Sequence, residues 1–175
     1  MTTFIDLLRQ RRSFRKFEER PVEEEKIEQI LRAALMAPSS KRSTPWSFVV
    51  VDEKDKLVKM AASREMGSKF LENAPLAIIV LADETKSEAW VEDASIAAIL
   101  MQLQAEDLGL GSCWVQVRGR RKDENITTEE CVRELINAPD NLKIECMIAI
   151  GYKDEEKKPF DESKLQLDKV FRNSF

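Results

Sequence analysis

Residues 89–108, AWVEDASIAAILMQLQAEDL, determine how this chain must fold. The centre of the stretch, from Ile96 to Met101, is apolar on every side, which is typical of a helix in the middle of a domain or at an interface. Gly109 follows directly, and glycine commonly ends a helix at this position. The sequence therefore predicts a long helix that is either central to the domain or part of an interface.

Four short apolar runs around this helix are typical of buried strands: residues 47–51, 76–81, 113–117 and 146–150. Helices are predicted over 4–11, 23–36 and 128–137, the last capped by Thr128, and charged helical sequence covers about 53–72. Strands and helices mixed in this way predict an α+β fold, and 175 residues are the length of a single domain.

Residues 153–175 form a polar C-terminal tail that nevertheless carries large apolar side chains. These are Phe160, Leu165, Leu167, Val170, Phe171 and Phe175. Because apolar side chains of this size favour burial, we expect the tail to dock, with a second subunit as one candidate surface.

Composition excludes several kinds of protein. The chain has no histidine, so it lacks a Ser-His-Asp triad, a Cys-His pair and an imidazole metal site. Cys113, Cys131 and Cys146 form no C-x-x-C pair, which favours reduced thiols and a cytoplasmic protein. The sequence shows no signal peptide and no membrane span. An enzyme of this composition is expected to rely on a cofactor, with no metal and no catalytic acid or base.

Residues 11–17, Arg-Arg-Ser-Phe-Arg-Lys-Phe, place four cations around one hydroxyl in a chain whose formal charge is −4. Arginine forks match phosphate geometry, so the segment predicts a bound anion, with Phe14 and Phe17 in the core. The alternative is a solvated basic helix end, which the helix dipole favours.

Three further segments follow in order: A-P-S-x-x-x-x-x-P-W at 37–46, L-G-L-G-S-x-W at 108–114 and I-G-Y at 150–152. With the cationic segment they make the chain similar to the nitroreductase family of FMN-dependent oxidoreductases, among its shortest members. The resemblance implies a mixed α+β fold with a central, mostly antiparallel sheet flanked by helices. It also implies a homodimer with FMN at the interface, and ping-pong hydride transfer from NAD(P)H to an acceptor such as a nitroaromatic or quinone.

The family pattern implies roles for individual residues. Arg11 would contact the FMN phosphate, Ser13 the ribityl–phosphate end and Arg15 the pyrimidine edge of the ring, with Arg12 in support. The other implied cofactor-binding residues are Pro38, Ser39 and Ser40 from the partner subunit, Lys69 at the ring edge, Gly111 and Ser112 where the backbone approaches the flavin, and Lys158 near the phosphate, with its neighbour Lys157 as a second candidate.

Some of these positions have a simpler interpretation. Lys69 and Lys158 also fit solvated surface lysines, and Gly111 also fits a turn after the helix. Arg42 and Thr44 stand where the family usually has Asn and often Gln, so substrate preference stays open.

Two rival functions remain. The first is a flavin-binding storage or sensor protein with little turnover, which the altered loop permits. The second is a nucleic-acid binder that uses the basic runs 11–16 and 118–122, although the chain is acidic overall and the second run has no interleaved aromatic residues. The favoured partners are therefore NAD(P)H and a small acceptor, without nucleic acid or membrane.

Overall fold

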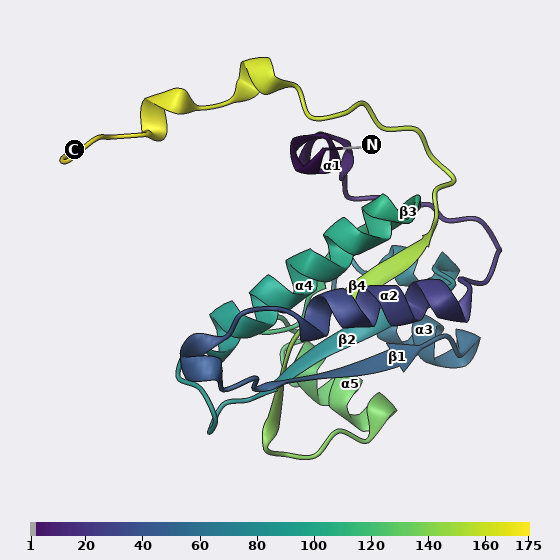
Figure 1. Ribbon diagram of the computed structural model, residues 1–175. Coiled ribbons are helices and arrows are strands. Elements are labelled where there is room, and N and C mark those ends of the chain that lie inside the picture. The colour runs from purple at the N-terminus through teal and green to yellow at the C-terminus, as the bar shows by residue number, and fades with distance from the viewer. Residues whose placement is uncertain (1–2) are drawn as a thin grey trace.

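The chain is built around a four-stranded antiparallel sheet, seen in a computed structural model that describes residues 3–175 (Figure 1). The strands are β1 (Trp46–Val51), β2 (Leu76–Asp83), β3 (Leu110–Gln116) and β4 (Leu142–Tyr152), and their order across the sheet is β1-β2-β4-β3. Every residue of β2 is buried, because this central strand has neighbours on both sides and helices on both faces. β3 lies at one edge, which leaves one side of its backbone open.

The helices divide between the two faces of the sheet. They are α1 (Phe4–Gln10), α2 (Glu24–Leu35), α3 (Lys54–Ala61), α4 (Trp90–Asp107) and α5 (Thr128–Ile136). Side chains alternate along β2, so Ile78 and Val80 pack with α2 and α4, whereas Ile79 and Leu81 pack with α3 and α5. The predicted long helix, which is α4, and the mostly antiparallel α+β fold are confirmed.

The structure corrects three local predictions. The stretch 53–72 is two elements, α3 and the 3₁₀ helix η2 (Lys69–Asn73), because Gly67 adopts φ +85° between them. β3 begins at Leu110 and includes the glycine-containing turn residues, and β4 runs beyond 146–150 at both ends. Thr128 is not the cap of α5: Thr127 is, with its side chain bonded to the Glu130 amide.

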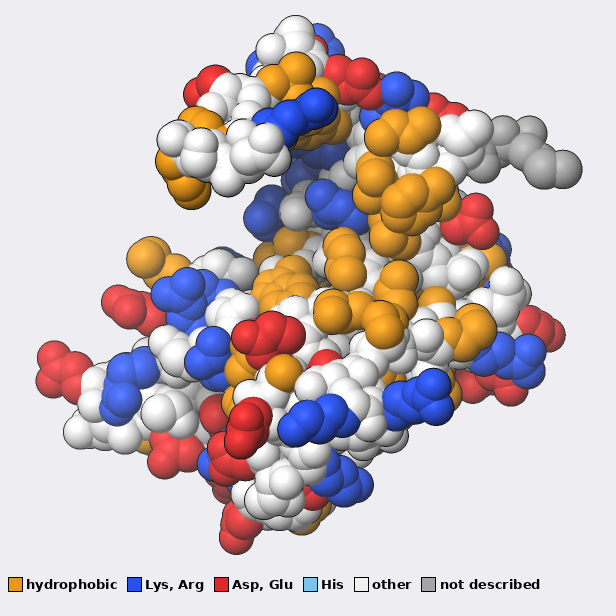
Figure 2. Space-filling view, turned by 60° about the vertical axis from the view of Figure 1, so that its left-hand side comes forward, with side chains coloured by type: hydrophobic (Ala, Val, Ile, Leu, Met, Phe, Trp, Pro, Cys, Tyr) orange, Lys and Arg blue, Asp and Glu red, His pale blue; other side chains and the backbone are white. Residues whose placement is uncertain are grey.

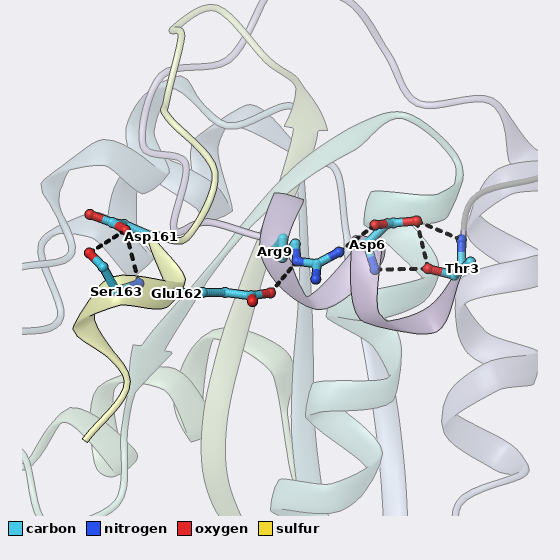
Figure 3. Close-up of polar contacts among 6 residues, drawn as sticks. All are labelled: Thr3, Asp6, Arg9, Asp161, Glu162 and Ser163. Atoms are coloured by element: carbon cyan, nitrogen blue, oxygen red, sulfur yellow. Dashed lines mark hydrogen bonds and ion pairs between the residues drawn. The ribbon is translucent and has the colours of Figure 1, made fainter. Parts of the chain in front are cut away.

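Helix α1 and residues 159–175, which we call the terminal arm, lie at one side of the body: α1 contacts α4, and residues 159–175 extend away from the sheet (Figure 1). The Phe160 amide donates to the Arg9 carbonyl over 2.7 Å, and Arg9 pairs with Glu162, so the two parts of the arm hold each other (Figure 3). Thr3 caps α1 with a capping box to Asp6. Among residues 3–175, no helix is long and apolar enough to cross a membrane.

Candidate functional site

The cationic segment 11–17 leaves α1, contacts the open edge of β3 near its start and then reaches the end of β4, where Phe17 pairs with Lys153. Ser13 pairs with Ser112 as an isolated parallel bridge, and the Phe14 amide donates to the Ser112 carbonyl over 3.0 Å. Phe14 and Phe17 are buried, as predicted, and the residues between and beside them turn outward. Burial of two phenylalanines thus fixes the direction in which the cations point.

A pocket of about 340 Å³ opens where this segment meets the start of the tail. Its polar lining is Arg11, Arg12, Ser13, Arg15 and Lys157, and its apolar lining is Leu8 and Phe160. Within the described chain no carboxylate lines it, so the pocket is strongly electropositive.

Lys157, rather than Lys158, is the tail lysine in this pocket. The Lys157 ammonium donates to the Ser13 carbonyl, whereas Lys158 lines neighbouring hollows and offers its carbonyl to Arg12 over 3.1 Å. The sequence offered both lysines and we favoured Lys158; the structure lines the pocket with Lys157 instead, because the positions of the two side chains depend on how the tail turns.

Glu155 holds the cationic segment in place from outside the pocket lining. Its carboxylate accepts from the Arg15 amide over 2.6 Å and from the Lys157 ammonium over 3.2 Å. Burial alone raises the pKa of Glu155, but these contacts outweigh it and keep the pKa below the ordinary value. The Glu155 carboxylate therefore stays charged and orders the two chain segments that line the pocket, one around Arg15 and one around Lys157.

Gly111 and Ser112 support the segment from below. A Cβ on Gly111 would come within 2.9 Å of the Phe14 Cβ, so glycine is needed there for Phe14 to pack. The Ser112 hydroxyl accepts from the Gln102 side chain of α4 over 3.2 Å. Both residues lie beside the cationic segment, and Gly111 makes room for Phe14.

Farther along the open edge, η2 approaches Arg15. The Arg15 guanidinium lies 5.9 Å from the centre of the Phe70 ring, and Lys69, the neighbouring residue, is exposed. The Arg64 guanidinium reaches the Gln116 carbonyl at the other end of β3, 3.4 Å away. Because Ser112, Trp114 and Gln116 alternate with Cys113 and Val115, their backbone groups face this open edge. The edge thus offers a strip of backbone flanked by cations.

The loop 37–46 lies elsewhere in the chain. The Ser40 amide donates to Asp93 in the first turn of α4 over 2.8 Å, and the buried Asp93 carboxylate also accepts from Ser87 over 2.8 Å. Three non-glycine residues here adopt positive φ: Lys41 at 51°, Arg42 at 57° and Thr44 at 42°. Such backbone is uncommon outside glycine, so the loop is held in a strained shape by its surroundings.

Within one chain, the structure does not bring this loop to the cationic pocket. The loop is tied to Asp93, whereas Ser112 beside the pocket is tied to Gln102. Nine residues of α4 separate these two anchors, which is about 14 Å along the helix. Pro38, Ser39 and Ser40 therefore form a second group, apart from Arg11, Arg12, Ser13 and Arg15.

Comparison with known proteins agrees with this architecture. The sequence profile of the nitroreductase family matches residues 8–64 and 55–152. A solved structure described as an FMN-dependent nitroreductase from Clostridium difficile R20291 has a TM-score of 0.96 and 51% identity, over 98% of this chain and 100% of that one. An Archaeoglobus fulgidus protein, provisionally named NADH dehydrogenase/NAD(P)H nitroreductase, is 33% identical over the full length of both chains. The chain belongs to the nitroreductase family.

Sequence reasoning missed three residues that organise the site: Asp93, Gln102 and Glu155. The first two sit on the central helix, where a polar residue in an apolar stretch was an available signal. Glu155 lies in an acid- and lysine-rich tail, and nothing in that pattern distinguishes it from its neighbours.

Proposed function

We propose that this chain binds FMN and uses it to oxidise NAD(P)H, passing the reducing equivalents to a small acceptor such as a nitroaromatic or a quinone. The observation that carries the proposal is the pocket lined by Arg11, Arg12, Ser13, Arg15 and Lys157. Four cations and a hydroxyl, with no lining carboxylate among the described residues, suit a phosphate dianion. FMN carries such a phosphate, and its ring would extend along the open edge of β3.

The chain's own residues would bind and orient the cofactor. Arg11, Arg12 and Lys157 would hold the phosphate, and the Ser13 hydroxyl would add a hydrogen bond. Arg15 lies on the side of the open edge toward Phe70, where a cation stabilises negative charge at the pyrimidine end of the ring. When bound, FMN would accept a hydride from NAD(P)H and deliver it to the acceptor in two separate half-reactions. No histidine is available as an acid or base, and the proposal requires none.

A second copy of the chain would complete the site. Within one chain the loop 37–46 and the cationic pocket are tied to α4 nine residues apart, at Asp93 and Gln102. A partner's Pro38–Ser40 loop could instead cover the ring, as the family resemblance implies. Exposed apolar side chains on the terminal arm and on α4 support an association of two chains: Phe4 is 64% exposed and Ile96 is 38% exposed. We therefore propose a homodimer, on which residues 153–175 dock.

Reconstitution with FMN tests the proposal. Purified protein should bind FMN, and adding NADH or NADPH without oxygen should bleach the flavin absorbance, which then returns when an acceptor is supplied. Bleaching separates an oxidoreductase from a flavin storage or sensor protein, which would bind FMN without turnover. Protein that binds no FMN but retards nucleic acid would contradict the proposal.

Arg11→Ala tests the phosphate contact. Loss of a charge-assisted hydrogen bond should weaken FMN binding by about 1.5–3 kcal/mol. Lys16→Ala is the matched control, because Lys16 belongs to the same basic run but does not line the pocket. Equal FMN affinity in the Arg11 variant and the wild type would contradict the assigned role.

A further inference from the structure

A chain of hydrogen bonds fixes the guanidinium of Arg118 just beyond the end of β3. The Trp114 indole N–H donates to the Gln116 side-chain oxygen over 2.8 Å, and the Gln116 amide nitrogen donates to Glu145 Oε1 over 3.2 Å. The other oxygen of Glu145 accepts from Arg118 Nε over 3.0 Å. The Glu145 side chain is only 5% exposed, so a buried carboxylate holds the arginine from beneath.

The outer edge of Arg118 remains free. Glu145 engages Nε alone, and across residues 3–175 neither Nη1 nor Nη2 has a hydrogen-bond or ion-pair partner. The Arg118 side chain is 50% exposed, and its Cζ lies 5.9 Å from the centre of the Trp90 ring. A guanidinium with a free, pre-oriented pair of nitrogens is suited to a carboxylate or phosphate, which it binds with two parallel hydrogen bonds.

The surroundings of Arg118 are positive despite Glu145. Arg64 binds the Gln116 carbonyl two residues earlier, and Arg120 follows in the next turn. Burial lowers the pKa of Arg64, and the nearby charge of Arg120 lowers it further. Two acids are near this cluster in the chain: Glu65 follows Arg64, donates its amide to the Arg121 carbonyl over 3.2 Å and has an exposed side chain, and Asp123 lies five positions after Arg118 with its side chain also exposed.

The position of Arg118 relative to the cationic pocket is set by β3. Ser112 lies beside Ser13 at one end of the open edge, and Gln116 lies about 13 Å farther along the strand. With the phosphate at the Ser13 end, the flavin ring would point toward the end that carries Arg118. A molecule that reacts at the ring would then come within reach of the free Nη1 and Nη2 nitrogens of Arg118.

We propose that Arg118 recognises an oxyanion on the molecule that reacts at the flavin, either a phosphate of the nicotinamide cofactor or a carboxylate of the acceptor. This inference rests on the proposed function, because that function places the reacting molecule beside Arg118. The relay from Trp114 through Gln116 and Glu145 makes Arg118 a recognition residue by holding its fork in one orientation. Glu145 is accordingly a positioning residue.

Paired probes that differ in one charge test the proposal on the FMN-loaded protein. The variants are Arg118→Gln, which removes the fork, and Arg118→Lys, which keeps the charge without the fork. Lys122→Gln is the matched control, because it removes the same charge from the same loop. For each, kcat/KM is measured with para-nitrobenzoate against para-nitrobenzamide, and with NADPH against NADH.

We expect Arg118→Gln to lower kcat/KM by about tenfold or more for the probe whose oxyanion Arg118 binds in the wild type. A loss for para-nitrobenzoate alone assigns the acceptor carboxylate, and a loss for NADPH alone assigns its extra phosphate. An equal loss for both nicotinamide cofactors assigns a phosphate that they share. Arg118→Lys should lose part of this effect, and Lys122→Gln should change each ratio less than about twofold. Equal kcat/KM values in wild type and Arg118→Gln would overturn the proposal. A loss that is equal for para-nitrobenzoate and para-nitrobenzamide, and absent for both nicotinamide cofactors, would also overturn it.

A second readout does not depend on the flavin. Two of the three tryptophans are close to Arg118: Trp114 begins the relay, and the Trp90 ring centre lies 5.9 Å from the Arg118 Cζ. An anion bound at Arg118 should therefore change their fluorescence. The same full-length protein is titrated with benzoate and with inorganic phosphate. We expect a saturable change in wild type that is lost in Arg118→Gln and kept in Lys122→Gln. Protein that binds no FMN but shows this change would refute the proposed function alone. The absence of a saturable change in the wild type would overturn the role of Arg118.

Discussion

The body of the chain and its terminal arm differ in how far their apolar side chains are buried. In the sheet, every residue of β2 from Leu76 to Asp83 is buried, and helices cover both faces. In the terminal arm, Val170 is 75% exposed and Leu167 is 72% exposed, and hydrophobic side chains gather beneath the overhang that the arm forms (Figure 2). The body covers both faces of its sheet but still leaves Ile96 of α4 38% exposed, whereas the arm exposes most of its large apolar side chains; a second molecule would cover both surfaces.

Removing residues 159–175 should have the largest effect, because it should weaken the dimer while leaving the fold of the body intact. The tail carries large exposed apolar side chains, and burying each against a partner stabilises by about 1.5–3 kcal/mol, so we expect the dimer to weaken at least about a hundredfold. The body should keep its helical circular dichroism, because the tail contributes nothing to its buried core. Sedimentation equilibrium measures the association. A truncated chain that dimerises as tightly as the full chain would show that residues 159–175 are not part of the interface.

Two neighbouring threonines in the body, Thr127 and Thr128, should affect stability in opposite directions. Thr127 caps α5 through the Glu130 amide, so Thr127→Val should destabilise the fold by about 1 kcal/mol. The Thr128 hydroxyl is buried with no partner among the described residues, so Thr128→Val should stabilise the fold by roughly 1 kcal/mol. Urea unfolding measures both. Changes of the same sign would mean that the Thr128 hydroxyl has a partner that the fold does not reveal, such as an ordered water.

The smallest effect concerns the contact that ties the end of β4 to α2. The Tyr152 hydroxyl donates to Glu23 and also accepts from the Lys26 ammonium over 2.8 Å. The Tyr152 hydrogen bond is the main cause that lowers the pKa of Glu23 from 4.5 to about 2. Because the folded-state pKa is lowered, this contribution to stability is fully present above pH 4.5 and is lost as pH falls toward about 2.

Tyr152→Phe should therefore flatten the pH dependence of stability. The variant should be less stable than wild type at neutral pH, and the difference between their melting temperatures should shrink as pH falls from 4.5 toward 2. Thermal unfolding followed across this pH range measures the difference. Parallel curves would show that the Tyr152 hydroxyl does not control the charge of Glu23.

Much of the body was predictable from sequence, since its signals are local. The apolar runs gave all four strands, and the spacing around Ile27 and Ile30 gave α2 within a residue at each end. The Thr127 cap was also within reach, because Thr127 and Glu130 have capping-box spacing, yet the neighbouring threonine was favoured. The break between α3 and η2 was missed because a charged, helix-compatible sequence concealed the turn at Gly67.

The candidate site was only partly predictable, because half of it depends on long-range contacts. The cationic segment could be recognised from its residues, and the structure gathers Arg11, Arg12, Ser13 and Arg15 around one pocket. The choice of Lys157 over Lys158 and the relay through Glu145 join segments far apart in the chain, and no local pattern records such contacts. The anchoring of Ser40 to Asp93, 53 positions later, is of the same kind.

Mixed dimers test most directly the central claim that one chain's cationic pocket and its partner's loop form one FMN site. Arg11→Glu removes the first half, and Ser40→Trp blocks the second while leaving the Ser40 amide free to bind Asp93. Each variant alone should fail to retain FMN after desalting. A heterodimer of one chain of each, purified with two different tags, holds both defects in one site and none in the other. The account predicts one FMN per heterodimer, and a heterodimer without FMN would contradict it.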